Sequence, residues 1–260
     1  FSESSDIYRA IQKCVLNRSG YLYDEPHFLL QQEVSEVGSY FSIIKAIAAG
    51  NHKLSTIAAV LEVKSTNLTK YLKTLMDLDI LERRVPVTEE NPEKSKRGLY
   101  KIKDNYLRFW FAFIYPNMSF IESGHSGIVM DKIRRGLTTS HIGFVYEDIC
   151  QERMWELNVN NAWPFQFSKL GGYWDAKNEI DIAALDPEGK NLILGECKYW
   201  KEPVGLNVLH ALETKACDVA WERDRRKVWY VLFSISGFSD ELRNHAATRD
   251  DLLLIDDGER

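Results

Sequence analysis

The chain has 260 residues, of which 45% are hydrophobic and 12% aromatic, a composition that builds packed cores and excludes extensive disorder. This length favours two domains. The formal net charge of −5 argues against a protein that coats nucleic acid uniformly. Residues 51–110 nevertheless carry more Lys and Arg than Asp and Glu, so local contact with phosphates stays compatible with the sequence.

The absence of a targeting signal, together with the pattern of cysteines, predicts a cytoplasmic protein. No apolar run approaches about 18 residues and no signal-peptide pattern follows the first residue, so we expect no membrane span. Because the chain begins with Phe1 and not with Met, we expect it to be a segment of a longer protein. Six scattered His residues without an HxxxH spacing argue against zinc. The four cysteines form no CxxC pair and are expected to be reduced and largely buried: Cys14, Cys150, Cys197 and Cys217.

Three helices with short turns are predicted between residues 40 and 82. The first ends at Gly50, a residue that suits a helix C-cap. Ser55 and Ser65 are the expected N-caps of the second and third helices. Two helices joined by a short turn and followed by a third are typical of a helix-turn-helix.

The third of these helices has a buried and an exposed side. Leu68, Leu72 and Leu75 follow the spacing of a buried stripe. The polar residues on its other faces are the predicted nucleic-acid contacts of this helix: Asn67, Lys70 and Lys73.

A wing is predicted after the helices. Residues 81–87 and 99–102 read as two strands, and residues 88–98 form a polar, charged tip between them. Lys94, Lys96 and Arg97 lie in this tip, where they could contact a nucleic-acid backbone. Charged loop tips are also often merely solvated, and winged helices also dock proteins, so both alternatives stay open.

The aromatic segment 104–116 invites a base-stacking interpretation. The spacing of Leu107, Phe111 and Ile114 favours a buried helix instead. Residues 117–140 contain turn formers and a short helix candidate at 128–134, which is typical of a junction between domains.

A β-hairpin is predicted over residues 179–198. Two branched apolar runs flank the turn formers of residues 187–190. With the turn centred between Glu188 and Gly189, Asp181 lies opposite Glu196 and Glu179 lies opposite Lys198. Side chains alternate across a strand, so these four charged groups share one face.

The apolar residues of the hairpin indicate that both of its faces are buried. Ala183 and Leu185 share the face of the charged residues, whereas Ile180, Ile182 and Ala184 lie on the other face. The charges therefore cluster where the strands end. Two carboxylates so close together repel each other unless a cation or a lysine offsets their charge. The residues alone leave a metal site and a structural ion cluster equally open.

Asp181, Glu196 and Lys198 on such a hairpin resemble the D…(D/E)xK motif of the PD-(D/E)XK nuclease superfamily. The order of elements is also similar to the αβββαβ core of that superfamily. A helix is predicted at 141–157, a strand near 165–170, the hairpin, a helix at 204–222 and a strand at 228–233. Ile180 stands where the family often has a Pro.

This resemblance implies a divalent-metal site for phosphodiester chemistry. Asp181 and Glu196 would be the main ligands of Mg²⁺ or Mn²⁺, with the Cys197 carbonyl as a third. Lys198 would orient or activate a water and offset charge in the transition state. Glu147, in the first helix, matches a further acidic residue that many members carry, although a Glu in a first helical turn also simply suits the helix dipole. Glu179 is expected to support the site and not to bind the metal.

Several separated segments resemble the C-terminal part of largely archaeal AAA+-type P-loop ATPases, in which a winged helix precedes a nuclease-like domain. They are Tyr40-Phe-Ser-Ile-Ile-Lys-Ala-Ile-Ala, Arg84-Val-Pro-Val-Thr-Glu, Ser95-Lys-Arg-Gly-Leu-Tyr and Asp104-Asn-Tyr-Leu-Arg-Phe-Trp-Phe. Residues 22–30 resemble the end of the ATPase lid. No GxxxxGK[ST] motif occurs, so this segment is not expected to bind ATP in the family's way.

The resemblance implies a multidomain α/β chain. The expected parts are the end of a helical lid (1–35), an all-α winged-helix domain (36–116), a linker (117–140) and a restriction-endonuclease-like α/β domain (141–260). The expected function is a DNA-binding, metal-dependent nuclease module. Its expected partners are DNA and an ATPase domain in the same chain, with homo-oligomer formation left open. The alternatives are an inactive nuclease fold used for DNA binding or assembly, and a winged-helix adaptor for another protein.

Overall fold

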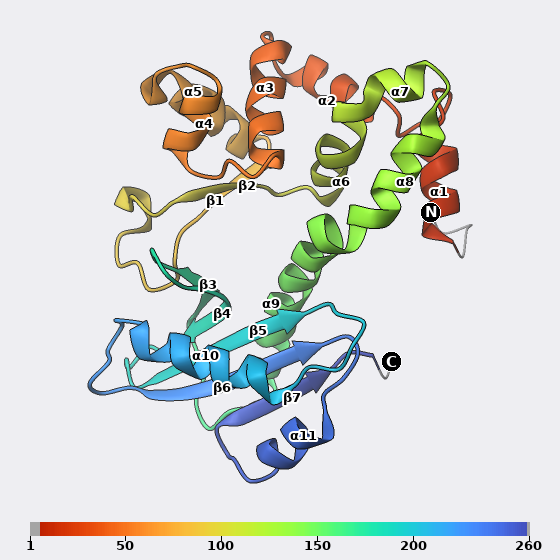
Figure 1. The fold of residues 1–260 in the computed structure, drawn as a ribbon. Coiled ribbons are helices and arrows are strands. Elements are labelled where there is room, and N and C mark those ends of the chain that lie inside the picture. The colour runs from red at the N-terminus through yellow and green to blue at the C-terminus, as the bar shows by residue number, and fades with distance from the viewer. Residues whose placement is uncertain (1–5, 259–260) are drawn as a thin grey trace. The chain divides into compact units, whose positions relative to one another are not determined.

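The computed structural model describes residues 6–258, and the chain divides into two compact units. Unit 1 holds the chain up to Arg84 together with Gly98–His141. Unit 2 holds Val85–Arg97 together with the chain from Ile142 onward. The fold class is mixed α/β, as predicted: the N-terminal region is mainly helical and a five-stranded sheet forms the C-terminal region (Figure 1).

The three helices predicted between residues 40 and 82 are present as α3 (Val37–Ala48), α4 (Leu54–Val60) and α5 (Ser65–Asp77). Gly50 has a φ of 91° and follows α3, so the predicted C-cap is confirmed.

The predicted N-caps of α4 and α5 are wrong. Lys53 and Lys64 hold the extended backbone that precedes each helix, and neither helix has a side-chain cap. Ser55 and Ser65 therefore lie inside the helices. Packing of the apolar side starts these helices earlier than their hydroxyl residues indicate.

The buried stripe of α5 is confirmed, because Leu68, Leu72 and Leu75 are all buried. The two strands predicted for the wing are present as β1 (Leu81–Arg84) and β2 (Leu99–Ile102), which pair antiparallel. β1 ends three residues before its predicted end. Pro86 cannot donate to a ladder, and the N–H of the next residue bonds instead to a carbonyl in unit 2.

The aromatic segment packs into the core of unit 1, as its spacing predicts. Leu107, Trp110, Phe111 and Ile114 are buried. The backbone forms α6 (Asn105–Phe109) and then a π-helical turn, η2 (Trp110–Ile114), which the sequence did not indicate.

Residues 117–140 are more helical than predicted. The short helix expected at 128–134 is α8 (Ser126–Leu137), which buries Val129, Ile133 and Leu137. The other elements of unit 1 are α1 (Ile7–Cys14), α2 (Glu25–Glu33), η3 (Tyr115–Asn117), α7 (Met118–Glu122) and η4 (Thr138–Ile142), whose last residue belongs to unit 2. Among residues 6–258, no helix combines the length and apolarity that a bilayer crossing requires.

Unit 2 is built on one sheet in the order β3-β4-β5-β6-β7. β4 pairs antiparallel with both β3 and β5, and β5, β6 and β7 run parallel. Its elements are η1 (Pro92–Lys94), α9 (Gly143–Val159), β3 (Lys169–Trp174), β4 (Glu179–Leu185), β5 (Asn191–Lys198), α10 (Leu206–Asp218), β6 (Lys227–Ser234), α11 (Asp240–Ala246) and β7 (Leu252–Asp256). The predicted strand near 165–170 lies about four residues later, and α11 with β7 was not predicted.

Helices cover both faces of this sheet (Figure 1). Tyr146, Cys150 and Met154 of α9 pack on one face, in a cluster with Ile182 and Ile193. The other face packs against α10 and α11, through residues that include Leu209, Leu212 and Leu242. β4 and β5 are therefore buried on both sides along most of their length, as the sequence indicated.

The predicted register of the β4–β5 hairpin is confirmed from Ile182↔Gly195 to Leu185↔Leu192. The predicted face of Ile180 is wrong, because Ile180 packs with Ala183 in the cluster under α10. The cause is a β-bulge between β3 and β4. Gly171 pairs with Ala183 and Tyr173 pairs with Ile180, so β4 carries one extra residue between these pairs.

Candidate active site

Asp181 lies in the bulge of β4, where the regular pairing with β5 ends. Its carboxylate accepts a hydrogen bond from the backbone N–H of Cys197 at 2.8 Å from Oδ2. The side chain thus takes the place of a ladder partner and is held in the plane of the sheet. Bulges commonly redirect a side chain in this way next to functional sites.

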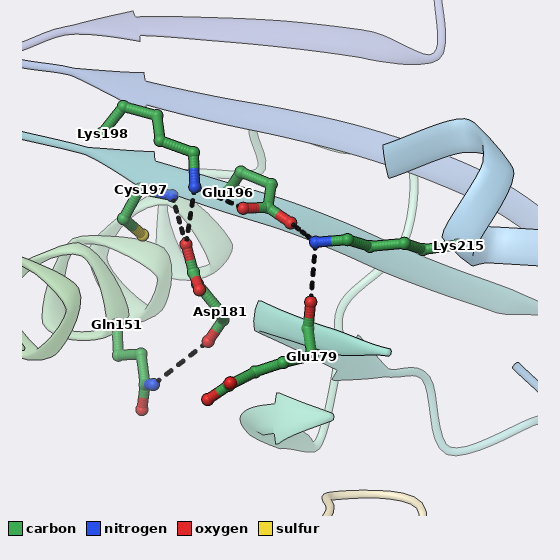
Figure 2. Close-up of polar contacts among 7 residues, drawn as sticks. All are labelled: Gln151, Glu179, Asp181, Glu196, Cys197, Lys198 and Lys215. Carbon is green, nitrogen blue, oxygen red and sulfur yellow. Dashed lines mark hydrogen bonds and ion pairs between the residues drawn. The ribbon is translucent and has the colours of Figure 1, made fainter. Parts of the chain in front are cut away.

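Lys198 of β5 reaches both Asp181 and Glu196, whose carboxylate lies between Lys198 and Lys215 (Figure 2). The Lys198 ammonium lies 2.5 Å from Glu196 Oε2 and 3.4 Å from Asp181 Oδ2. The structure therefore brings together the three residues of the D…(D/E)xK pattern. Their side chains are mostly buried, with exposed fractions of 16% for Asp181, 6% for Glu196 and 19% for Lys198.

A second ammonium completes this cluster. Lys215, near the end of α10, lies 2.6 Å from Glu196 Oε1 and 2.7 Å from the backbone carbonyl of Glu179. Both oxygens of Glu196 therefore contact a lysine. Glu179 takes part through its carbonyl, and its carboxylate turns away from Lys215 (Figure 2), which agrees with a supporting position.

The two carboxylates have opposite pKa shifts. Burial raises the pKa of Asp181, and the negative charge of Glu196 raises it further. Burial also acts to raise the pKa of Glu196, but Lys198 and Lys215 outweigh it and the pKa falls below its ordinary value. Such a divergence between neighbouring acids is typical of sites with separate acid and base roles.

Lys198 keeps its charge in this surrounding. Burial acts to lower the pKa of Lys198, but Asp181 and Glu196 outweigh it and the pKa rises. A lysine with a raised pKa is a poor proton acceptor near neutral pH. The electrostatics therefore favour charge stabilisation over water activation as the role of Lys198.

Helix α9 approaches the same end of the hairpin. Glu147 is half-buried and lies close enough to Cys197 that its charge helps to raise the pKa of that thiol, after burial and Cys150. The interpretation of Glu147 as a residue of the first helical turn is wrong, because α9 begins at Gly143. One turn further, Gln151 Nε2 donates to the Asp181 carbonyl at 3.4 Å.

Sequence reasoning missed Lys215 and Gln151. Gln151 follows Glu147 at the i+4 spacing that places two side chains on one helix face, and this signal could have indicated it. Lys215 lies in a predicted helix, but nothing local distinguishes it from other helical lysines. Its place depends on how α10 packs on the sheet.

Only a few oxygen atoms of this cluster could serve as ligands of a metal ion. Among the described residues 6–258, no group of three or more His, Cys, Asp and Glu side chains is placed to hold an ion. Asp181 uses Oδ2 for both of its contacts, and each oxygen of Glu196 already contacts an ammonium group. A hard cation such as Mg²⁺ often takes only one or two protein carboxylates, with waters and substrate phosphates as its other ligands.

The cysteines are reduced and largely buried, as predicted. All four are free thiols, and Cys14, Cys150 and Cys197 are buried, whereas Cys217 is exposed. Burial raises the pKa of Cys197 well above its ordinary value, with Cys150 as the next cause, so its thiol is neutral and a poor ligand.

The predicted nucleic-acid contacts lie on two elements. Asn67, Lys70 and Lys73 are exposed on α5. Lys94 and Lys96 are exposed in the loop between β1 and β2. Arg97 is instead engaged within unit 2, where its side chain contacts Glu89 and the Trp174 carbonyl.

The loop Val85–Arg97 packs against the edge strand β3. The Val87 N–H donates to Gly172 O at 3.0 Å, and Trp174 Nε1 donates to Arg97 O at 3.0 Å. The Arg97 guanidinium pairs with Glu89 and also donates to Trp174 O. These contacts explain why the loop belongs to unit 2 although its flanking strands belong to unit 1.

Comparison with known proteins finds similarity to proteins of unknown function. Residues 110–216 match the model of DUF234, described as archaeal and bacterial proteins of unknown function. The chain is also 39% identical over 192 residues to an uncharacterized protein of Methanocaldococcus jannaschii. That alignment covers 74% of this chain and 42% of the relative, so the chain spans less than half the length of the curated protein that it matches. The chain is thus similar to archaeal proteins, as the sequence motifs indicated.

Proposed function

We propose that unit 2 hydrolyses phosphodiester bonds in DNA with the help of a divalent cation. The observation that carries this proposal is the convergence of Asp181, Glu196 and Lys198 at one end of the β4–β5 hairpin. The protonated amine suits a substrate that is an anion and develops more negative charge as it reacts, and the two acids suit a cation that would accompany it.

Each residue has a separate part in the proposed reaction. The protonated Lys198 binds a non-bridging phosphate oxygen and stabilises the charge of the transition state. Asp181, held by the Cys197 N–H, keeps Oδ1 for a cation or for the attacking water. Gln151 fixes the backbone of Asp181 and thereby the direction of its carboxylate.

The donor set fits Mg²⁺ or Mn²⁺ when the substrate completes the coordination. Asp181, one oxygen of Glu196 and the Cys197 carbonyl would hold the ion, and Glu147 would contact it through water. Bound there, the ion would supply polarisation of the scissile phosphate. Glu196 becomes available only when one ammonium moves, and Lys215 is the more exposed of the two, at 30% against 19%.

A second candidate is a nuclease fold that binds DNA without cutting it. The observation that favours it is the balance of charge, because two lysines already match the two carboxylates. In that case the cluster would be structural and no cation would bind.

We also propose that the module works within a longer chain. The segments quoted above resemble the end of a P-loop ATPase, and the relative from M. jannaschii is more than twice as long as the stretch that it shares with this chain. In this proposal, α5 and the wing bind duplex DNA through exposed basic residues, and unit 2 acts on it.

A metal titration tests which candidate holds. The melting temperature of the chain is measured against Mn²⁺ and Mg²⁺ concentration, for the wild type and for Asp181→Asn. A bound ion stabilises the folded state by about 2.7 kcal/mol at a hundred times its dissociation constant. We expect a saturable shift in the wild type and none in Asp181→Asn.

The control for this titration is Glu188→Gln, an exposed acid at the tip of the same hairpin that pairs with Lys190. It should keep the full shift. A wild type without any shift would favour the non-catalytic fold, and an equal shift in Asp181→Asn would place the ion elsewhere.

A further inference from the structure

An exposed tryptophan stands beside the candidate site. Trp200 follows β5 by two residues, and its exposed fraction is 47%. The Lys198 Nζ atom lies 5.8 Å from the centre of its indole ring. The same ammonium contacts Asp181 and Glu196, so the indole borders the group that would meet the scissile phosphate.

The backbone around Trp200 is fixed on both sides. The preceding residue, Tyr199, packs edge-to-face against Tyr146 of α9 with ring centres 5.5 Å apart. The Trp200 carbonyl accepts a hydrogen bond of 2.6 Å from the hydroxyl of Ser236. Because this backbone is already ordered, a ligand that stacks on the indole has less conformational entropy to remove than on a mobile loop.

A half-exposed indole at the rim of a charged site calls for a ligand with both a flat ring and an anion. Large aromatic side chains gain free energy from burial, so a half-exposed indole beside a charged group offers apolar area that a ligand can cover. Stacking on a base has no sequence requirement, because every base has a π-face. A nucleotide whose phosphate meets Lys198 carries its base within reach of Trp200.

We infer that Trp200 is a stacking platform for an unpaired base next to the scissile phosphate. This inference rests on the proposed function and adds a substrate class to it. In an intact duplex the base faces are covered by their neighbours, so an indole reaches one only in single strands, frayed ends or splayed junctions. The preferred substrate of the site is therefore a strand with at least one unstacked base.

The chain offers a matched control for this tryptophan. Trp155 on α9 is 44% exposed and packs against Phe167 with ring centres 4.9 Å apart. Phe167 precedes Ser168, whose N–H bonds to Leu185 at the far end of β4 from Asp181. Trp155→Ala thus removes an indole of similar exposure that lies away from the site.

The test is a binding measurement in EDTA, where the substrate stays intact. Fluorescence anisotropy follows a labelled oligothymidylate, the same oligomer with abasic sugars, and a duplex. For the wild-type chain we expect the oligothymidylate to bind more tightly than its abasic form. Trp200→Ala should weaken oligothymidylate binding by about 5- to 150-fold, which is the range that stacking on one side chain contributes.

Three further outcomes complete the test. Trp200→Phe should restore most of the affinity, Trp155→Ala should keep it, and Trp200→Ala should bind the abasic oligomer as the wild type does. An unchanged affinity in Trp200→Ala, or an equal loss on the abasic oligomer, would overturn the platform. A wild type that binds none of the three probes would overturn it too.

A separate cleavage assay with Mn²⁺ distinguishes the two claims. Trp200-dependent binding without cleavage would leave the platform standing and refute the hydrolysis. Cleavage by the wild type, with a binding affinity that does not change in Trp200→Ala, would support the hydrolysis and refute the platform.

Discussion

At the residue scale, the site depends on how charge is shared around Glu196. Glu196 is 6% exposed and both of its oxygens contact an ammonium group. A cation that binds this carboxylate has to displace one of these contacts. Lys198 is also tied to Asp181, whereas Lys215 reaches in from α10 and is more exposed.

Lys215 is therefore predicted to compete with the metal ion. In Lys215→Met the aliphatic stem is kept and the charge is lost, so Glu196 Oε1 becomes available. We expect the apparent dissociation constant for Mn²⁺ to fall several-fold, measured by the midpoint of the thermal shift. The control is Lys190→Met, an exposed lysine at the hairpin turn, which should leave the midpoint unchanged. A weaker affinity in Lys215→Met would show that this lysine supports the metal site instead of blocking it.

The sequence was most informative about this site where the information is local. Pro187 and Gly189 define the turn, and the turn fixes the register from Leu185↔Leu192 to Ile182↔Gly195, which ends one residue before Asp181 and Glu196. The bulge that turns Asp181 into the sheet plane depends on how β4 pairs with β3, a strand that the sequence placed about four residues too early. Lys215 depends on tertiary packing in the same way. Both features lie beyond what spacing within one hairpin can indicate.

At the element scale, the close approach of β5 and β6 requires a glycine. A Cβ atom added at Gly195 would lie 2.6 Å from Val231 Cγ1 and 2.9 Å from the Val231 carbonyl oxygen. Relief of this contact needs a shift of the strand that carries Glu196. Steric overpacking of this kind typically costs about 1–3 kcal/mol.

Gly195→Ala should therefore lower the free energy of unfolding by about 1–3 kcal/mol, measured by denaturant titration. Gly127→Ala is its matched control, because Gly127 lies in α8 and nothing stands within 4 Å of the added Cβ. It should be neutral or raise stability by up to about 1 kcal/mol. Equal stability of Gly195→Ala and the wild type would contradict the packing of β5 on β6.

The π-helical segment η4 holds a histidine whose protonation opposes folding. Burial lowers the pKa of His141 from 6.5 to about 4, and the neighbouring charge of Arg108 adds to this. Its ring packs on Phe109, and its Nδ1 atom has no hydrogen-bond partner among the described residues. The folded state thus keeps His141 neutral at a pH where the unfolded chain already binds a proton.

The sign of the resulting pH dependence follows from linkage. The stability linked to His141 is fully present above about pH 6.5 and is lost as the pH falls toward about 4, by at most about 3 kcal/mol. His141→Phe should reduce this loss, measured as the difference in unfolding free energy between pH 7 and pH 4.5. An identical pH profile in the variant and the wild type would show that other groups cause the loss.

Helices and strands were predicted well where their apolar pattern is continuous. The spacing of apolar residues and the length of each apolar segment predicted four features: the stripe of α5, the hairpin, α10 and β6. The strand near the C-terminus, β7, was missed although Leu252, Leu253, Leu254 and Ile255 form a clear apolar run. Helix starts were misplaced because packing, and not the nearest serine, sets where α4 and α5 begin.

At the scale of the whole molecule, the segment predicted as a wing is divided between the two units. The strands β1 and β2 belong to unit 1, while the loop Val85–Arg97 belongs to unit 2 and packs on β3. Arg97 helps to hold this loop through Glu89 and Trp174, so changing it would disturb the loop itself. Lys94 and Lys96 are exposed and provide the cleaner test of nucleic-acid contact.

Charge reversal at Lys94 and Lys96 should weaken duplex DNA binding by several-fold or more. Each lost phosphate contact should also reduce the slope of log affinity against log salt by about 1. The measurement is a salt series with the full chain, beside a Glu90→Lys variant in the same loop, which should bind at least as tightly as the wild type. An unchanged slope in the double reversal would move the contact off this loop, with Lys70 and Lys73 of α5 as the next site to change.

The central claim is that Asp181, Glu196 and Lys198 together cut phosphodiester bonds. The most direct measurement is incubation of the chain with supercoiled plasmid and Mn²⁺, beside Asp181→Asn, Lys198→Ala and the Glu188→Gln control. We expect nicking by the wild type and by Glu188→Gln, and a rate at least about 100-fold lower in the other two variants. Nicking at the wild-type rate by Asp181→Asn and Lys198→Ala, or no nicking by the wild type, would contradict the claim.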